Sequence, residues 1–216
     1  MHLLPRVYAS IIDESLRENR QMAFVSGSRQ VGKTTICREL GDIYLDWDNE
    51  DHRLLILEGP AAVASFAGVE RLAERPLRIV FDELHKYKRW KQFLKGFFDT
   101  YEDRLRIIVT GSSRLDVYRK GGDSLMGRYF LYRMHPLSAG ELCRPEPPIS
   151  IIREPVRLPD ADWQALWDFG GHPEPFLKRS HRFSLRWREL RRQQLLREDI
   201  RDMTGIQDLD QLAVLA

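Results

Sequence analysis

The residues best suited to chemistry in this sequence form a glycine-rich run that ends in a lysine and two threonines. Gly27, Gly32, Lys33 and Thr34 fit the spacing G-x-x-x-x-G-K-[ST], between an apolar run and a stretch with helical character. Glycines let the backbone approach phosphate oxygens, and a helix N-terminus presents unpaired N–H groups to an anion. The sequence therefore predicts a phosphate-binding loop with these contributing residues: Gly27, Ser28, Arg29, Gln30, Val31, Gly32, Lys33, Thr34 and Thr35.

Two residues of this loop have predicted roles of their own. Lys33 is expected to reach the β- and γ-phosphates, and Thr34 to offer its hydroxyl to Mg²⁺, which prefers oxygen ligands. The structural alternative is a glycine turn that happens to precede a helix beginning Lys-Thr.

A pair of carboxylates follows the apolar run 78–81. Asp82 is expected to order the magnesium shell, and Glu83 to position or deprotonate an attacking water. Two adjacent acids at a buried strand end repel each other unless a cation compensates. The pair predicts hydrolysis rather than phosphoryl transfer to another substrate; the alternative is a polar strand end that enters a turn.

Hydroxyl and arginine side chains follow two further apolar runs. Ser112, or Thr110, is a candidate for holding the attacking water, and a helix N-cap at Ser112 or Ser113 is the alternative. Glycines at 121, 122 and 127 predict a mobile loop that delivers Arg128 to charge on the γ-phosphate. Arg128 is otherwise a solvated residue at the start of a strand.

Alternating elements must position these side chains. Short apolar runs at residues 22–25, 43–45, 77–81, 106–109 and 129–132 alternate with helical stretches, which predicts an α/β fold with a parallel sheet. Apolar residues at helical spacing further predict helices over 3–19 and 90–101.

The proline-rich segment 144–160 predicts a domain boundary. We expect a core over 1–144, a linker and helical lid over 145–203, and the truncated start of a further region over 204–216.

Composition sets the remaining bounds. The 216 residues include 34 Lys and Arg against 32 Asp and Glu, so net charge does not argue for a polyanionic partner. Cys37 and Cys143 lack metal or disulfide-scaffold spacing, and no apolar run approaches a membrane span. We therefore expect a cytoplasmic protein without membrane contact.

Five segments together resemble AAA-type P-loop ATPases, in particular an uncharacterised prokaryotic and archaeal-type group usually fused to a C-terminal domain of unknown function. The matching segments are residues 27–35, 81–86, 110–113, 125–128 and 136–142, and the resemblance covers about residues 1–200.

The resemblance implies Mg-dependent ATP hydrolysis, a sheet in the order 5-1-4-3-2 and a sensor hydroxyl within 110–113. It further implies an arginine finger at Arg128, acting within one chain or on a neighbour in a homo-oligomer. Residues 170–173 would open the lid with Pro173 near the adenine, and Arg6 would close the base pocket. The cycle of ATP and ADP would drive an attached effector that this chain lacks.

Alternatives to an ATP-hydrolysing switch stay open. Residues 82–85 also spell the D-E-x-H box of helicases, although the spacing from Lys33 is short and there is no room for a second motor domain. The basic stretch 176–197 fits a nucleic-acid backbone, which makes a nucleic-acid-dependent ATPase or DNA-binding regulator the second function class. A nucleotide-binding module with negligible turnover is the third.

Overall fold

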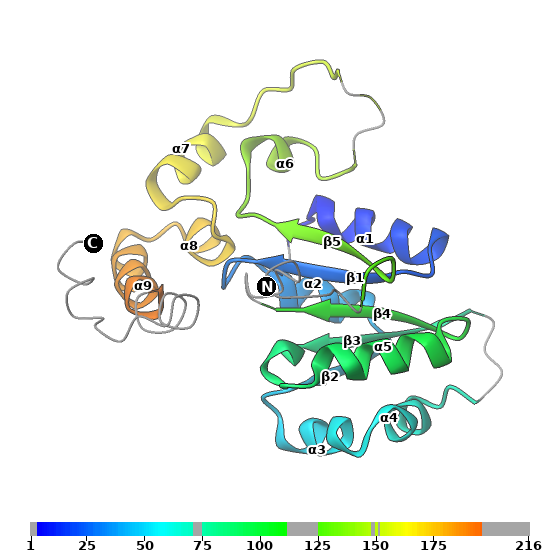
Figure 1. The fold of residues 1–216 in the computed structure, drawn as a ribbon. Helices are drawn as coiled ribbons and strands as arrows, with labels where there is room; N and C mark the ends of the chain where they lie inside the picture. The colour runs from blue at the N-terminus through cyan, green and yellow to red at the C-terminus, as the bar shows by residue number, and fades with distance from the viewer. Residues whose placement is uncertain (1–3, 71–74, 112–124, 148–149, 151, 196–216) are drawn as a thin grey trace. The chain divides into compact units, whose positions relative to one another are not determined.

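A computed structural model of the chain describes residues 4–70, 75–111, 125–147, 150 and 152–195 (Figure 1). The chain divides into two compact units, Met1–Val156 and Arg157–Ala216. The predicted boundary near residue 144 stays a prediction, and the predicted region 204–216 lies outside the described residues. No helix of the described part is long and apolar enough to cross a membrane.

The first unit is built on a five-stranded parallel sheet in the order β2-β3-β4-β1-β5. This is the order 5-1-4-3-2 that the family resemblance implied, read from the opposite edge, and the α/β P-loop NTPase fold is thereby confirmed. The strands are β1 (Met22–Gly27), β2 (Ile43–Asp46), β3 (Leu77–Asp82), β4 (Leu105–Thr110) and β5 (Tyr129–Met134). Because all five run parallel, their carboxyl ends meet at one edge of the sheet.

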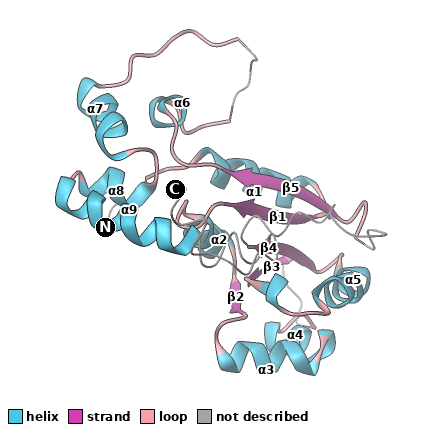
Figure 2. Cartoon of the chain, turned by 60° about the vertical axis from the view of Figure 1, so that its left-hand side comes forward, coloured by secondary structure: helices cyan, strands magenta, loops and turns pink. Residues whose placement is uncertain are grey.

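Helices cover both faces of the sheet (Figures 1 and 2). One face buries apolar side chains of α1 and α2, including Ile12, Leu16 and Ile36. The other face packs against α3, α4 and α5 through Ile56, Val63 and a cluster of phenylalanines. The helices of this unit are α1 (Val7–Glu18), α2 (Lys33–Leu40), α3 (Glu50–Glu58), α4 (Pro60–Ala67), α5 (Trp90–Tyr101) and α6 (Ala139–Cys143), with a 3₁₀ turn η1 (Leu84–Lys86) after β3.

The central strands are apolar on both sides because helices cover both faces. Every residue of β1 is buried, and Phe81 of β3 meets Phe93 and Phe97 of α5 edge to face, with ring centroids 5.6 and 5.7 Å apart. The predicted helix over 90–101 coincides with α5. The rigid centre of the sheet thus fixes the ends of β1, β3 and β4.

The second unit contains three helices among its described residues. They are α7 (Asp160–Phe169), α8 (Pro173–Lys178) and α9 (His181–Gln194). Ala165, Phe169 and Phe176 are buried, and the Ser180 side chain caps α9 by accepting from the N–H of Phe183. The helical character predicted for this region is present; its role as a lid stays a prediction.

Candidate active site

The predicted phosphate loop joins the carboxyl end of β1 to the start of α2, and its shape depends on glycine at two positions. Gly27 has φ +148°, and a Cβ there would lie 2.2 Å from the Met134 carbonyl oxygen. Gly32, which precedes the first residue of α2, has φ +97°. Gln30 also adopts a left-handed conformation, with φ 63°. The backbone therefore forms a tight arch that a non-glycine sequence could not follow without strain.

Lys33 bends back over this arch. Its Nζ donates to the carbonyl oxygens of Gly27 at 3.0 Å and Ser28 at 2.8 Å, and only 7% of the residue is exposed. Thr34 and Thr35 follow on the exposed side of the first helical turn. The loop thus gathers one ammonium group, one helix N-terminus and two hydroxyls at the same edge of the sheet.

The carboxylate of Asp82 lies directly beside the loop. The Thr34 hydroxyl donates to Asp82 Oδ2 at 2.9 Å, which joins the two motifs that sequence spacing predicted separately. Thr110 donates from β4 to the other oxygen, Oδ1, and the strand register sets Thr110 level with Asp82. Asp82 is 5% exposed, so these hydroxyls satisfy a buried charge.

Tyr44 is a third hydroxyl at Asp82 that sequence reasoning missed. It lies in β2, and its hydroxyl donates to Asp82 Oδ2 at 2.5 Å. Burial is the largest cause that raises the pKa of Tyr44, and the hydrogen bond to Asp82 is the second. The phenol therefore stays protonated and acts as a donor. The signal that could have identified Tyr44 is its position two residues before the end of a strand paired with β3, and this pairing was implied only by resemblance.

Glu83 leaves the sheet in a left-handed conformation, with φ 55°. Its N–H donates to the Thr110 carbonyl at 3.2 Å, which fixes the turn between β3 and η1. Its carboxylate lies 3.5 Å from Lys86 Nζ and 3.7 Å from His85 Nε2. Burial is the largest cause that raises the pKa of Glu83; Lys86 opposes it, and the charge of Asp82 adds to it. A carboxylate with a raised pKa at a strand end is suited to accepting a proton.

Arg128 lies at the opposite end of the sheet from the loop. The carbonyl of Arg128 accepts the N–H of Met22, which is the first residue of β1. The phosphate loop begins at Gly27, the last residue of the same strand. Five residues of strand separate the two ends by about 17 Å, so Arg128 cannot reach the loop of its own chain. Its guanidinium makes a two-point ion pair with Asp99, Nε–Oδ1 at 2.6 Å and Nη2–Oδ2 at 3.0 Å.

Three other predicted residues have different outcomes. Ser112 lies outside the described residues. Pro173 begins α8 in the second unit, and its predicted contact with adenine stays a prediction. Arg6 lies beside the loop, but its guanidinium donates to protein oxygens: the carbonyls of Val31 and His135 and the carboxylate of Glu141. Its predicted closing of the base pocket stays a prediction.

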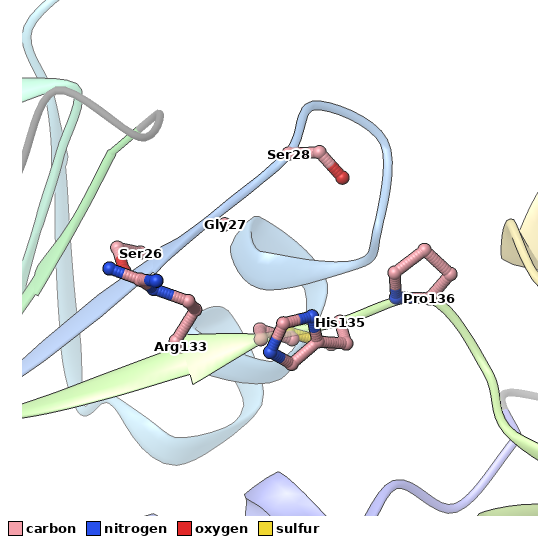
Figure 3. A pocket seen from close by; sticks show the side chains of 7 residues that line it. Ser26, Gly27, Ser28, Arg133, His135 and Pro136 are labelled. Carbon is pink, nitrogen blue, oxygen red and sulfur yellow. The ribbon is translucent and has the colours of Figure 1, made fainter.

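A cavity of about 240 Å³ opens next to the loop, between the ends of β1 and β5 (Figure 3). Residues 26–28 line one side and residues 133–136 the other. The cavity therefore borders the start of the loop on the β5 side.

Comparison with solved structures found distant likenesses. AMPPCP-bound DnaA from Aquifex aeolicus has 13% identity and a TM-score of 0.49, with 94% of this chain and 62% of that chain covered. The Aeropyrum pernix ORC1 protein in complex with DNA has 16% identity and a TM-score of 0.44 (65% and 48% covered), and C. elegans PCH-2 has 14% and 0.42 (61% and 43% covered). The chain spans less than two thirds of each of these proteins, and likenesses of this size carry no functional conclusion.

A comparison with curated protein sequences found no match. A family model described as an AAA domain, in contrast, matches residues 19–143, more than half of the chain. That segment contains the phosphate loop, Asp82, Glu83 and all five strands. The chain belongs to this AAA domain family.

Proposed function

We propose that the protein binds ATP with Mg²⁺ and hydrolyses it to ADP and phosphate, and that this cycle drives a conformational switch in an attached effector. The observation that carries the proposal is the 2.9 Å contact between Thr34 and Asp82. It brings the helix end that would hold phosphate next to the carboxylate that would organise a metal.

The residues present fit such a ligand pair. The loop backbone from Gly27 to Gly32 and the Lys33 ammonium would bind the phosphates, in the manner of helix N-terminal anion sites. Thr34 and Asp82 supply the oxygen donors that Mg²⁺ prefers. Magnesium, when bound, would neutralise charge on the phosphate oxygens and stabilise the developing charge of hydrolysis.

Glu83 is the proposed proton acceptor for the attacking water. Its carboxylate lies one residue beyond the metal-binding candidate, and burial raises its pKa, so it holds a proton more readily than an ordinary glutamate. Ser112 is the proposed hydroxyl that positions this water, because the hydroxyl of Thr110 already donates to Asp82.

Arg128 is proposed to act on the nucleotide of a neighbouring subunit. About 17 Å of strand lies between it and the loop of its own chain, so a role in catalysis requires a homo-oligomer. The effector and the homo-oligomer are proposals that rest on the family. A cytoplasmic setting is a proposal that rests on the two free cysteines among the described residues.

Binding and turnover of ATP test the proposal. Wild type should bind ATP with Mg²⁺ and release phosphate; Lys33→Ala should lose binding, and Glu83→Gln should bind but not hydrolyse. Lys95→Ala, which removes an exposed lysine of α5, is the control for loss of positive charge. ATP binding by Lys33→Ala equal to that of the control would contradict the proposal.

A second candidate, a nucleic-acid-dependent ATPase or DNA-binding regulator, rests on α9. Five arginines and one glutamate lie in this helix, and Arg182 and Arg186 are exposed. Such a helix suits phosphate backbones, with strong dependence on salt. Binding of a labelled oligonucleotide at low salt, lost in Arg182→Ala with Arg186→Ala, would support this function; no binding would remove it.

A further inference from the structure

We propose that Arg6 and Glu141 form a device that orients the backbone of the phosphate loop, so that the loop is ready for phosphate before nucleotide arrives. This inference rests on the proposed function. It assigns the two residues a positioning role rather than contact with the base.

The carbonyl oxygen of Val31 accepts a hydrogen bond from Arg6 Nη1 at 2.8 Å. In a planar trans peptide the C=O and the following N–H point in opposite directions. Holding the Val31 oxygen towards Arg6 therefore points the N–H of Gly32 away from Arg6, in the opposite direction within the same peptide plane. Gly32 is the residue before α2, where backbone N–H groups serve as anion ligands.

Two further contacts hold the guanidinium in place. Arg6 Nε donates to Glu141 Oε1 at 2.7 Å, and Nη2 donates to the His135 carbonyl at 2.8 Å. Three different nitrogens of one planar group thus have three acceptors in a fixed fork, which a lysine could not reproduce. His135 also borders the cavity beside the loop (Figure 3).

Glu141 is itself anchored. The same Oε1 accepts the N–H of Val7, the first residue of α1, at 3.0 Å, and a carboxylate at a helix N-terminus is favourable. The backbone N–H of Glu141 donates to the side chain of Ser138, which caps α6. The segment 136–142 contributed to the family resemblance, but the sequence assigned it no physical role. Through Glu141 and Arg6, it links α1, the end of β5 and the phosphate loop.

The pair is sealed from solvent. The side chains of Arg6 and Glu141 are 5% and 6% exposed, so removing one partner alone leaves a buried charge. Replacing both partners with apolar residues of similar volume avoids that cost, because buried ion pairs exchanged for hydrophobic residues often keep stability. A double substitution can thus separate folding from positioning.

The test compares Arg6→Met with Glu141→Met in one chain against the exposed pair change Arg20→Met with Glu102→Met. The control pair joins the same residue types, Nη1–Oε1 at 2.9 Å, with its arginine side chain 62% exposed. Dissociation constants are measured by calorimetry for Mg-ATP and for Mg-tripolyphosphate, which has no base. Arg6→Lys serves as a second variant that keeps the charge, and circular dichroism selects a temperature at which each variant is folded.

A positioning role predicts that both ligands bind about tenfold more weakly or worse in the double variant and in Arg6→Lys, because one hydrogen bond to a charged group is misaligned. The control should bind as wild type does. If Lys33→Ala loses binding while the double variant and Arg6→Lys bind both ligands as tightly as wild type, the inference is overturned and the proposed function stays intact.

Two other outcomes would also overturn it. Weaker ATP binding with unchanged tripolyphosphate binding would make Arg6 a base contact. Failure of the wild type to bind either ligand would remove the proposed function itself.

Discussion

Asp82 is the residue at which most of the candidate site meets. Its buried carboxylate accepts hydrogen bonds from Thr34, Tyr44 and Thr110, which come from three different elements. A buried charge of this kind requires several partners, because each unmet acceptor is costly. The hydroxyls hold the carboxylate in one orientation at the edge where ligands bind in open α/β sheets.

Tyr44→Phe should lower the free energy of unfolding by about 1 kcal/mol, the typical worth of one intramolecular hydrogen bond. Thr34 still donates to the same oxygen, so ATP binding should persist. Urea denaturation measures the change, with Tyr101→Phe as the control, since the Tyr101 hydroxyl has no hydrogen bond among the described residues. Equal stability of Tyr44→Phe and wild type would show that the bond to Asp82 is not formed in solution.

Glu83 makes the stability of the protein depend on pH. Its pKa is raised in the folded state, chiefly by burial, from the ordinary value of 4.5. The folded state then holds this proton more tightly than the unfolded state, so stability falls as pH rises above 4.5, until Glu83 is ionised in both states.

Glu83→Gln cannot ionise and should escape this loss. The variant should be more stable than wild type at pH 7, and the difference should shrink as pH falls below 4.5. Urea denaturation at pH 4 and pH 7 tests this, with the exposed Glu58→Gln as the matched control. A difference that is the same at both pH values would contradict the burial of Glu83.

Residue spacing predicted part of this site and could not predict the rest. The loop and the pair Asp82 and Glu83 are local patterns, readable because their chemistry depends on neighbours in the chain. Tyr44 and the partners of Arg6 depend on strand register and on contacts up to 135 positions apart. No local pattern encodes such contacts.

At the scale of elements, the close pairing of β1 with β5 limits what can occupy Gly27. Its Cβ would collide with the Met134 carbonyl at 2.2 Å, and Met134 lies level with Gly27 in the sheet. The end of β1 and the start of the loop can therefore be built only around a residue without a side chain.

Gly27→Ala should destabilise the protein by roughly 3 kcal/mol, from backbone strain and overpacking combined. Gly96→Ala is the matched control, because Gly96 lies within α5 and a Cβ there has nothing within 4 Å. The control should gain about 0.5 to 1 kcal/mol. Chemical denaturation measures both, and a Gly27→Ala variant as stable as wild type would mean that β5 is not paired there as described.

The apolar runs predicted all five strands, with ends that differ from the observed ones by at most two residues. Buried strands covered on both faces carry continuous apolar sequence, so their position is readable. The helix predicted over 3–19 is shorter as observed, Val7–Glu18, with Pro5 and Arg6 before it. Helices α3 and α4 were not predicted individually, because their apolar residues do not follow a helical period: they are consecutive at 54–57 in α3 and occupy nearly all of α4.

At the scale of the whole molecule, the role proposed for Arg128 would require cooperation between copies of the chain. It lies at the far end of the sheet from its own phosphate loop and is held by Asp99. If Arg128 acts in hydrolysis, it acts on a second chain, and the rate per chain must then rise with protein concentration.

Mixing two inactive variants tests this cooperation. Arg128→Ala chains keep Glu83, and Glu83→Gln chains keep Arg128, so mixed assemblies should recover part of the ATPase rate that each variant lacks alone. Arg17→Ala, which removes another exposed arginine of an ion pair, is the control and should remain active alone. No recovery in mixtures would argue against a shared site.

The central claim is that residues 27–34 and Asp82 hold one Mg-nucleotide together. The most direct measurement is the affinity for ATP with and without Mg²⁺, by calorimetry, in wild type and in Asp82→Asn. We predict that Mg²⁺ strengthens ATP binding to wild type, that Asp82→Asn loses this gain, and that affinity without Mg²⁺ is no weaker in the variant. An equal gain from Mg²⁺ in both proteins would contradict the account.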